Sequence, residues 1–172
     1  MNLTWITADV AIGGRISESE AGRLGADERV GAVVDLRSEA VDEAAVLRRQ
    51  GIAFLHLPTD DHAAITPAML ELGVAFVQEH LALGRRTLIH CEHGIGRSAT
   101  LALAVLVAEG RTPLGALNLA KGKRGSVSPS PAQYGCWRDW LEDRKAAGGE
   151  TWEVPDFDAF AAIAYRHLTQ AR

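Results

Sequence analysis

The sequence predicts an α/β fold: a single domain with a mainly parallel central sheet of four to five strands and helices on both faces. Its 172 residues are the length of one domain with a full hydrophobic core. Within residues 1–144, apolar segments of strand length alternate with longer segments of helical period, which is the pattern of βα units. The strand-length segments are apolar on both faces, as strands covered by helices on two sides must be.

Four segments are predicted as strands. They lie over residues 10–12, 30–36, 52–57 and 87–90. The second contains Ala32, Val33 and Val34 in succession, so neither of its faces is polar enough to meet water. Asp35 and Arg37 stand at its end and are expected to form a structural ion pair.

Five segments are predicted as helices. They lie over residues 39–50, from Pro67, over residues 97–109, from Pro113 and over residues 131–144. Thr66 and Thr112 precede proline and are suited to cap a helix whose first position that proline occupies. Gly51 is suited to end the first helix. The helix over residues 97–109 is apolar on nearly all sides and is therefore expected to be the central buried one.

A connector and a further helix are predicted at the C-terminal end. Residues 146–150 break the pattern, and beyond them Phe157, Phe160, Ala164 and Leu168 form the stripe of an amphipathic helix. We expect this helix to dock on the body, and contact with a partner is the alternative. The predicted organisation is a main domain over residues 1–145 and a docked segment over residues 146–172.

Composition and charge exclude several classes of protein. Lys and Arg number 18 against 22 Asp and Glu, a net charge of −4, so nucleic-acid binding is not expected. The longest apolar run, residues 99–108, is far shorter than the roughly 18 residues of a membrane span, and the amino end resembles no secretory signal. Two cysteines, Cys91 and Cys136, favour a reducing compartment. A cytoplasmic protein without a membrane partner is expected, and its oligomeric state is left open.

One stretch carries chemistry, and it lies between a predicted strand and the apolar helix. It reads His90-Cys91-Glu92-His93-Gly94-Ile95-Gly96-Arg97-Ser98. The two glycines let the chain curl until successive backbone N–H groups converge on one point. That point lies at the amino end of a helix, where unpaired N–H groups and the helix dipole attract anions. Glu92, His93, Gly94, Ile95, Gly96 and Arg97 are therefore predicted to bind a tetrahedral oxyanion.

The side chains of this stretch suggest individual roles. The same field stabilises a thiolate, so Cys91 is the candidate nucleophile. Arg97 offers a planar fork that matches two phosphate oxygens, and Ser98 is placed to stabilise the sulfur as a leaving group. His90 is expected to turn its ring inward and hydrogen-bond the loop. The remaining histidines show no metal-ligand spacing beside Cys91, so neither a metal nor a cofactor is expected.

HCEHGIGRS resembles the active-site signature of the cysteine-dependent protein tyrosine phosphatase superfamily, HCxxGxxR followed by Ser or Thr. Two further stretches, VAIGG from Val10 and VVDLR from Val33, resemble strand segments of its compact dual-specificity branch. The resemblance covers about residues 5–142. It implies hydrolysis of phosphomonoesters through a cysteinyl-phosphate, without metal or cofactor.

The resemblance also implies a general acid about thirty residues before the nucleophile. Asp61 stands thirty residues before Cys91 within LPTDDHAAIT, and Asp60 replaces it if the loop shifts by one residue. Gln133 follows a stretch similar to the one after the catalytic helix in relatives where a glutamine orients the hydrolytic water. A basic run nearby, Lys121, Lys123 and Arg124, is either a solvated face or a selector of anionic substrates.

The predicted function is hydrolysis of phosphotyrosine in proteins, with phosphoserine and phosphothreonine as further substrates. Two other enzyme classes compete with it. His93 is similar to the CxHGxxR loop of relatives that remove phosphate from RNA 5′ ends. Phosphoinositide or inositol phosphate hydrolysis is the other class, although relatives with that preference often carry lysine in the loop. A non-enzymatic alternative is a pseudophosphatase that captures a phosphorylated partner.

Overall fold

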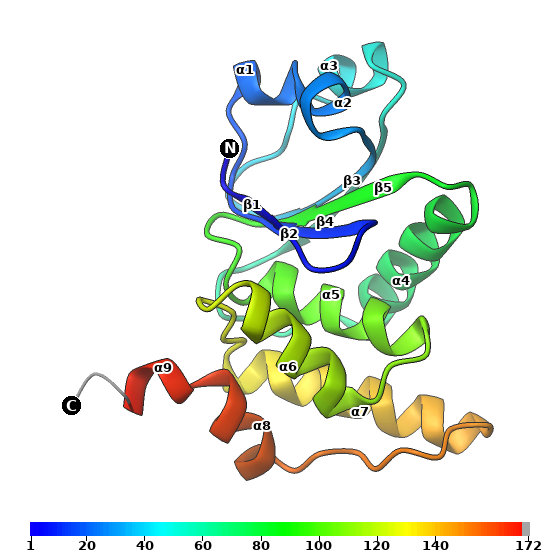
Figure 1. Ribbon diagram of the computed structural model, residues 1–172, viewed down its shortest axis with the longest axis vertical. Coiled ribbons are helices and arrows are strands. Elements are labelled where there is room, and N and C mark those ends of the chain that lie inside the picture. Colours follow the sequence, from blue (N-terminus) through cyan, green and yellow to red (C-terminus); the bar gives the residue numbers. More distant parts are fainter. Residues whose placement is uncertain (170–172) are drawn as a thin grey trace.

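A five-stranded sheet separates two layers of helices in the computed structural model, which describes residues 1–169 (Figure 1). The strands are β1 (Leu3–Trp5), β2 (Val10–Gly13), β3 (Val30–Arg37), β4 (Ala53–Thr59) and β5 (Arg86–His90). Their order across the sheet is β1-β2-β5-β3-β4, and only the β1–β2 pair is antiparallel. The predicted fold class is confirmed.

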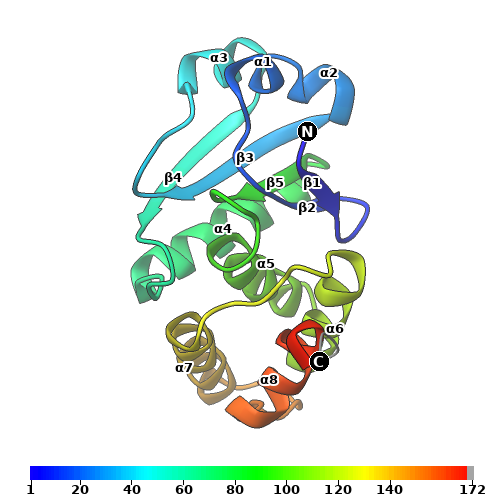
Figure 2. The same cartoon turned by 90° about the vertical axis from the view of Figure 1, so that its left-hand side faces the viewer.

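Short helices cover one face of the sheet and long helices cover the other (Figure 2). The first layer contains α1 (Glu18–Ala21), α2 (Leu24–Glu28) and α3 (Ala44–Arg49). The second contains α4 (Pro67–Ala82), α5 (Arg97–Ala108), α6 (Pro113–Lys123), α7 (Pro131–Ala147) and α8 (Phe157–Ala164), and α9 (Arg166–Thr169) follows α8. Each layer has its own hydrophobic cluster against the sheet, the larger one centred on α5.

The four parallel strands end at the same edge of the sheet. β5 lies between β2 and β3, so the residue that follows it, Cys91, lies near the middle of that edge. In open sheets of this kind ligands bind beyond the carboxyl ends of the strands. The topology therefore places the cysteine-containing loop where a binding site is expected.

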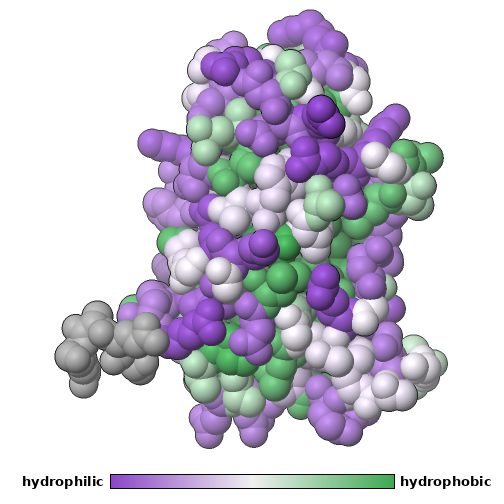
Figure 3. All heavy atoms as spheres, in the orientation of Figure 1, coloured by the Kyte–Doolittle hydropathy of each residue, from purple (hydrophilic) through white to green (hydrophobic). Residues whose placement is uncertain are grey.

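The predicted helix signals act as expected. The side chains of Thr66 and Thr112 accept hydrogen bonds from the first turns of α4 and α6, each with proline at the first positions. Gly51 has φ +74°, the left-handed conformation that ends a helix. From Arg97 to Val107, α5 is buried on all sides. On the face of the molecule drawn in Figure 3, apolar side chains gather mainly over the half built from the long helices.

One predicted helix begins later than expected, and three short elements were missed. The helix predicted over residues 39–50 begins only at Ala44, because Asp42 is drawn inward by Arg37 and His90 and its backbone N–H donates to Asp35. β1, α1 and α2 were not predicted. These elements are short, so they carry little periodicity, although α1 begins at a Ser–Glu capping box.

The C-terminal stripe ends earlier than predicted. Phe160 and Ala164 are fully buried, whereas Leu168 lies in α9 and is 61% exposed. α7 also extends to Ala147, into the predicted connector. The predicted segment over residues 146–172 includes residues 170–172, which lie outside the described residues. No helix in the described part of the chain is long and apolar enough to cross a membrane.

Candidate active site

The loop between β5 and α5 brings the predicted nucleophile to the amino end of a buried helix. Cys91 is buried, and its Sγ accepts a hydrogen bond from the backbone N–H of Gly94 at 3.3 Å. The Oγ of Ser98, from the first turn of α5, lies 3.3 Å from the same sulfur. Gly96 is the N-cap of α5 and supplies no capping side chain, so no side chain covers the N–H groups of that turn.

Both loop glycines are required by their surroundings. Gly94 has φ +71°, and a Cβ there would lie 2.6 Å from the backbone of Gly13. A Cβ on Gly96 would lie 2.5 Å from Oε1 of Gln133. The loop therefore curls tightly between neighbours that exclude any side chain at these two positions.

Arg97 is held at one end of its guanidinium group. The side chain is buried, and its Nη1 and Nη2 each donate to a carboxylate oxygen of Glu39 at 2.8 Å. Nη1 also donates to the carbonyl of Thr59 at 2.9 Å. Burial by itself lowers the pKa of Arg97, but the hydrogen bonds to Glu39 and the nearby charges of Cys91, Glu39 and Asp61 together raise it above its ordinary value. Its Nε has no partner among the described residues, and an oxyanion in the loop would satisfy this buried donor.

Glu39 should make stability depend on pH in the acid range. Hydrogen bonds from Arg97 lower the pKa of Glu39 from 4.5 to about 2. A pKa depressed by folding adds stability that is present above the unfolded value and lost as the pH falls through the folded value. We expect the wild type to melt at a higher temperature than Glu39→Gln at pH 5, with the difference shrinking towards pH 2. Because Glu39 is 43% exposed, solvent screening keeps the effect small.

Glu43→Gln is the matched control for these melting curves. Its side chain makes no capping hydrogen bond at the start of α3. This variant should show no such trend with pH. A constant difference between wild type and Glu39→Gln from pH 5 to pH 2 would contradict the assigned pairing.

The segment after β4 places Asp61 at the loop. Its Oδ1 lies 3.4 Å from Nη2 of Arg97, and the side chain is 53% exposed. The chain turns at His62, which has φ +61° and whose carbonyl accepts a hydrogen bond from Oγ of Ser130 at the start of α7. No contact joins the Asp60 side chain to Arg97 in the described part of the chain. Of the two aspartates, Asp61 is thus the one whose carboxylate contacts Arg97.

Gln133 lies beside the phosphate-binding loop, as the prediction of a water-positioning role requires. It is fully buried, its Oε1 accepts from the backbone N–H of Ser130, and it closely approaches Gly96. Its Nε2 has no partner within residues 1–169. This N–H donor beside the loop is therefore free to bind a ligand or a water molecule.

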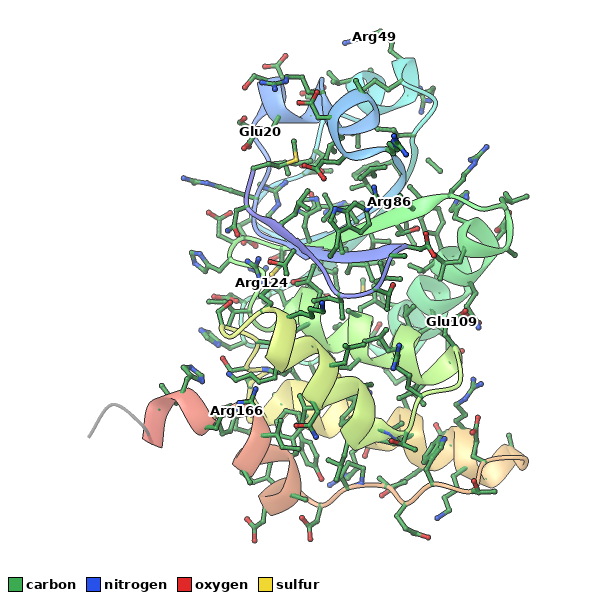
Figure 4. All side chains as sticks on the ribbon, in the orientation of Figure 1. Glu20, Arg49, Arg86, Glu109, Arg124 and Arg166 are labelled. Atoms are coloured by element: carbon green, nitrogen blue, oxygen red, sulfur yellow. The ribbon has the colours of Figure 1, made fainter. Side chains whose placement is uncertain are left out.

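Two residues of the basic run, Lys121 and Arg124, are buried and bind backbone carbonyls. They are therefore neither part of a solvated face nor selectors of anionic substrates. Arg124 is 9% exposed and donates to the carbonyls of Gly94 and His93, at 2.8 and 3.0 Å (Figure 4). Because Arg124 holds these two carbonyls on the outer side of the loop, it favours a loop conformation in which the N–H groups face Cys91. Lys121 is 2% exposed, and its Nζ donates to the carbonyls of Val127 and Ala164. Burial lowers the pKa of Lys121 to about 8.

A buried ionic cluster lies under the loop, and it corrects the prediction for His90. The ring turns inward, but its Nε2 contacts Oδ2 of Asp42 at 2.7 Å instead of the loop. Arg37 forms the predicted pair with Asp35 and also donates to Asp42 at 2.6 Å. Asp35, Asp42 and His90 have the proximity of metal ligands. Because Arg37 already occupies both aspartates, we assign an ion-pair cluster.

Sequence reasoning missed Glu39 and Asp42 as parts of the site, and it placed Arg124 near the site without predicting that it binds the loop carbonyls. A buried arginine needs a carboxylate, so Arg97 signalled that an acidic partner exists. Nothing in the spacing identifies that partner among 22 acidic residues, and Glu39 lies 58 positions away. The contact arises only when the segment after β3 folds over the loop.

Comparison with known proteins agrees with this geometry. Over 118 residues the chain is 30% identical to mouse (Mus musculus) phosphatidylglycerophosphatase and protein-tyrosine phosphatase 1, covering 64% of this chain and 61% of that protein. It is 34% identical over 76 residues to mouse dual specificity protein phosphatase 2, covering 43% of this chain and 24% of that protein. The chain thus spans less than two thirds of either relative.

Two solved phosphatase structures have the same fold as this chain. The crystal structure of PTPMT1 aligns with TM-score 0.77 and 26% identity, covering 84% of this chain and 97% of that one. The active form of Tk-PTP aligns with TM-score 0.74 and 27% identity, covering 83% and 97%.

The fold, the loop and these similarities define a member of the cysteine-dependent protein tyrosine phosphatase superfamily, of the compact dual-specificity type. Residues 14–111 match the family described as "Polymorphic toxin system, DSP-PTPase phosphatase", and the chain belongs to it.

Proposed function

We propose that this phosphatase hydrolyses phosphotyrosine in proteins, with phosphoserine and phosphothreonine as further substrates of the same site. One observation carries the proposal. The Sγ of Cys91 accepts a hydrogen bond from the backbone N–H of Gly94 at the amino end of α5, beside a buried Arg97 whose Nε lacks a partner within residues 1–169. That arrangement suits a phosphate group directly in front of a nucleophilic sulfur.

In the first step the Cys91 thiolate attacks phosphorus, an S–P bond forms and the P–O bond to the leaving group breaks. Nε and Nη2 of Arg97, with the loop N–H groups, hold the equatorial oxygens as the transferred group flattens. Asp61 donates its proton to the departing oxygen. A cysteinyl-phosphate results, and the alcohol or phenol leaves.

In the second step water attacks the cysteinyl-phosphate, and Asp61 takes the proton from that water. Nε2 of Gln133, buried beside Gly96, is placed to orient the water. The S–P bond breaks, and the hydroxyl of Ser98, 3.3 Å from the sulfur, stabilises the returning thiolate. Neither step needs a metal or a cofactor.

Charge around the loop supports a singly phosphorylated substrate. Glu39, Asp61 and Glu92 lie beside it and are all partly exposed, with side-chain exposures of 43, 53 and 25%. Each is paired with an arginine, Glu39 and Asp61 with Arg97 and Glu92 with Arg15, so these arginines attract the additional phosphate groups of polyphosphorylated inositols less strongly. A phosphotyrosine side chain carries only one phosphate, which lies at the far end of its aromatic ring.

Phosphorylated lipid is the second candidate substrate. A relative at 30% identity is named as a phosphatidylglycerophosphatase, and PTPMT1, which aligns with TM-score 0.76, has been crystallised with PI(5)P. RNA 5′-phosphatase activity and a non-catalytic phosphate-binding role are the two remaining alternatives of the sequence analysis.

Phosphate release in EDTA would separate these candidates. Peptides of matched sequence with phosphotyrosine or phosphothreonine, and a short-chain phosphatidylinositol 5-phosphate, would be compared at equal concentration. We expect release from the phosphotyrosine peptide that Cys91→Ser abolishes. Faster release from the lipid would favour the second candidate, and release from none of them would contradict both.

We also propose the domain organisation of the sequence analysis, with a catalytic domain over residues 1–145 and a C-terminal segment from residue 146 whose described part, up to residue 169, is docked on it. Burial of Phe160 against Tyr134 and Trp137 supports the docking. The free state of Cys91 and Cys136 supports a reducing compartment, and on that ground we propose a cytoplasmic location.

A further inference from the structure

A cavity of about 550 Å³ lies between the segment that follows Asp61 and helix α7. Ile65, Thr66 and Pro67 form one wall. The other wall is one face of α7, whose contributing residues are Ala132, Gly135, Cys136, Asp139, Trp140 and Asp143. No lining residue belongs to the phosphate-binding loop, so the cavity is separate from the site described above.

Gly135 keeps this cavity open. It lies inside α7, where glycine destabilises a helix relative to alanine. A Cβ on Gly135 would meet no atom within 4 Å. Gly73 in α4 differs, since a Cβ there would lie 2.8 Å from Leu101 and the packing on α5 requires glycine. The packing of the fold gives no such reason at Gly135.

The wall of the cavity is apolar, and it includes a tryptophan whose hydrogen-bonding capacity is unused. Trp140 is 5% exposed, and its indole N–H has no partner among residues 1–169. Buried indole N–H groups usually have a partner. Burial raises the pKa of the neighbouring Cys136 thiol, so it remains protonated and weakly polar.

The rim of the cavity is acidic. Glu71 and Asp143 line it and form no ion pair or hydrogen bond in the described part of the chain. Asp139, also on the rim, is paired with Arg138 on the same helix. Another cation of α7, Arg144, is paired with Glu150. Two negative charges are thus left without a partner at the mouth of an apolar cavity.

We propose that this cavity binds a short peptide segment of a partner protein. The segment places an aliphatic or aromatic side chain against Gly135 and Trp140, and an arginine or lysine against Glu71 and Asp143. An anionic membrane surface does not suit the acidic rim. The bound segment lies against residues that directly follow Asp61. This proposal concerns binding and holds whichever phosphoester the site hydrolyses.

The test is an amide NMR titration of the whole chain with the peptide acetyl-Ala-Arg-Leu-Phe-Arg-Ala-amide. We expect saturable shifts confined to the neighbourhood of residues 64–71 and 132–143. Two control peptides, with glutamate replacing both arginines or serine replacing both apolar residues, should bind far more weakly. Equal binding of the three peptides, or no binding of the first, overturns the proposal.

Variants of the protein locate the interaction. Glu71→Gln with Asp143→Asn should weaken binding about tenfold, and Gly135→Leu, which fills the cavity, should abolish it. Gly122→Leu is the matched control, because Gly122 is also helical and a Cβ there meets nothing within 4 Å. Hydrolysis of p-nitrophenyl phosphate reports that each variant is folded. Unchanged binding by Gly135→Leu, or binding to phosphatidylserine vesicles that Gly135→Leu abolishes, would contradict the peptide proposal.

Discussion

Cys91→Ser is expected to reduce phosphatase turnover to less than about 1% of the wild-type rate. A serine hydroxyl is not ionised at neutral pH and needs a general base to attack phosphorus. The groups within hydrogen-bond distance of the sulfur are the N–H of Gly94 and the hydroxyl of Ser98. Both stabilise a thiolate, and neither removes a proton from an alcohol. The measurement is phosphate release from a phosphotyrosine peptide.

Binding separates loss of chemistry from loss of the site. The loop N–H groups and Arg97 are unchanged in Cys91→Ser, so the variant should still bind tungstate, a tetrahedral oxyanion. Calorimetry would measure that affinity in both proteins. Turnover above about 1% with tungstate binding retained would show that another residue is the nucleophile.

Asp61→Ala is expected to slow hydrolysis by a factor of about 10² to 10⁴ when the leaving group is poor. A poor leaving group, such as the phenol of phenyl phosphate, departs only if its oxygen is protonated. A good one, such as dinitrophenolate, leaves without a proton, so the same variant should lose far less activity on dinitrophenyl phosphate. The ratio of the two losses isolates the acid from other effects of the substitution.

Asp60→Ala is the matched control for this experiment. Asp60 is adjacent in sequence and is also a loop carboxylate, but only Asp61 contacts Arg97 within the described residues, at 3.4 Å. Asp60→Ala should therefore slow both substrates to a similar and small extent. If Asp60→Ala shows the strong dependence on leaving group, the two aspartates have been assigned in the wrong order.

Features that depend only on residues close together in the chain, such as helix caps and turns, could be predicted from the sequence. Thr66 and Thr112 cap the helices predicted from them, and Gly51 has the left-handed conformation expected of it. The predicted start of the helix over residues 39–50 is wrong because side chains from other elements hold that segment in another conformation. Asp42 is held by Arg37 and His90, and this prevents a helix from beginning at residue 39.

By itself, the sequence determined the α/β fold class and the loop from Cys91 to Arg97, because periodicity, caps and glycines act within a few residues of one another. Tertiary structure decided which carboxylate holds Arg97, that Arg124 supports the loop, and that Asp61 faces it while Asp60 does not. Those contacts join residues 30 to 58 positions apart in the chain. Many residues of suitable chemistry exist at such separations, and only the packing of helices on the sheet selects among them.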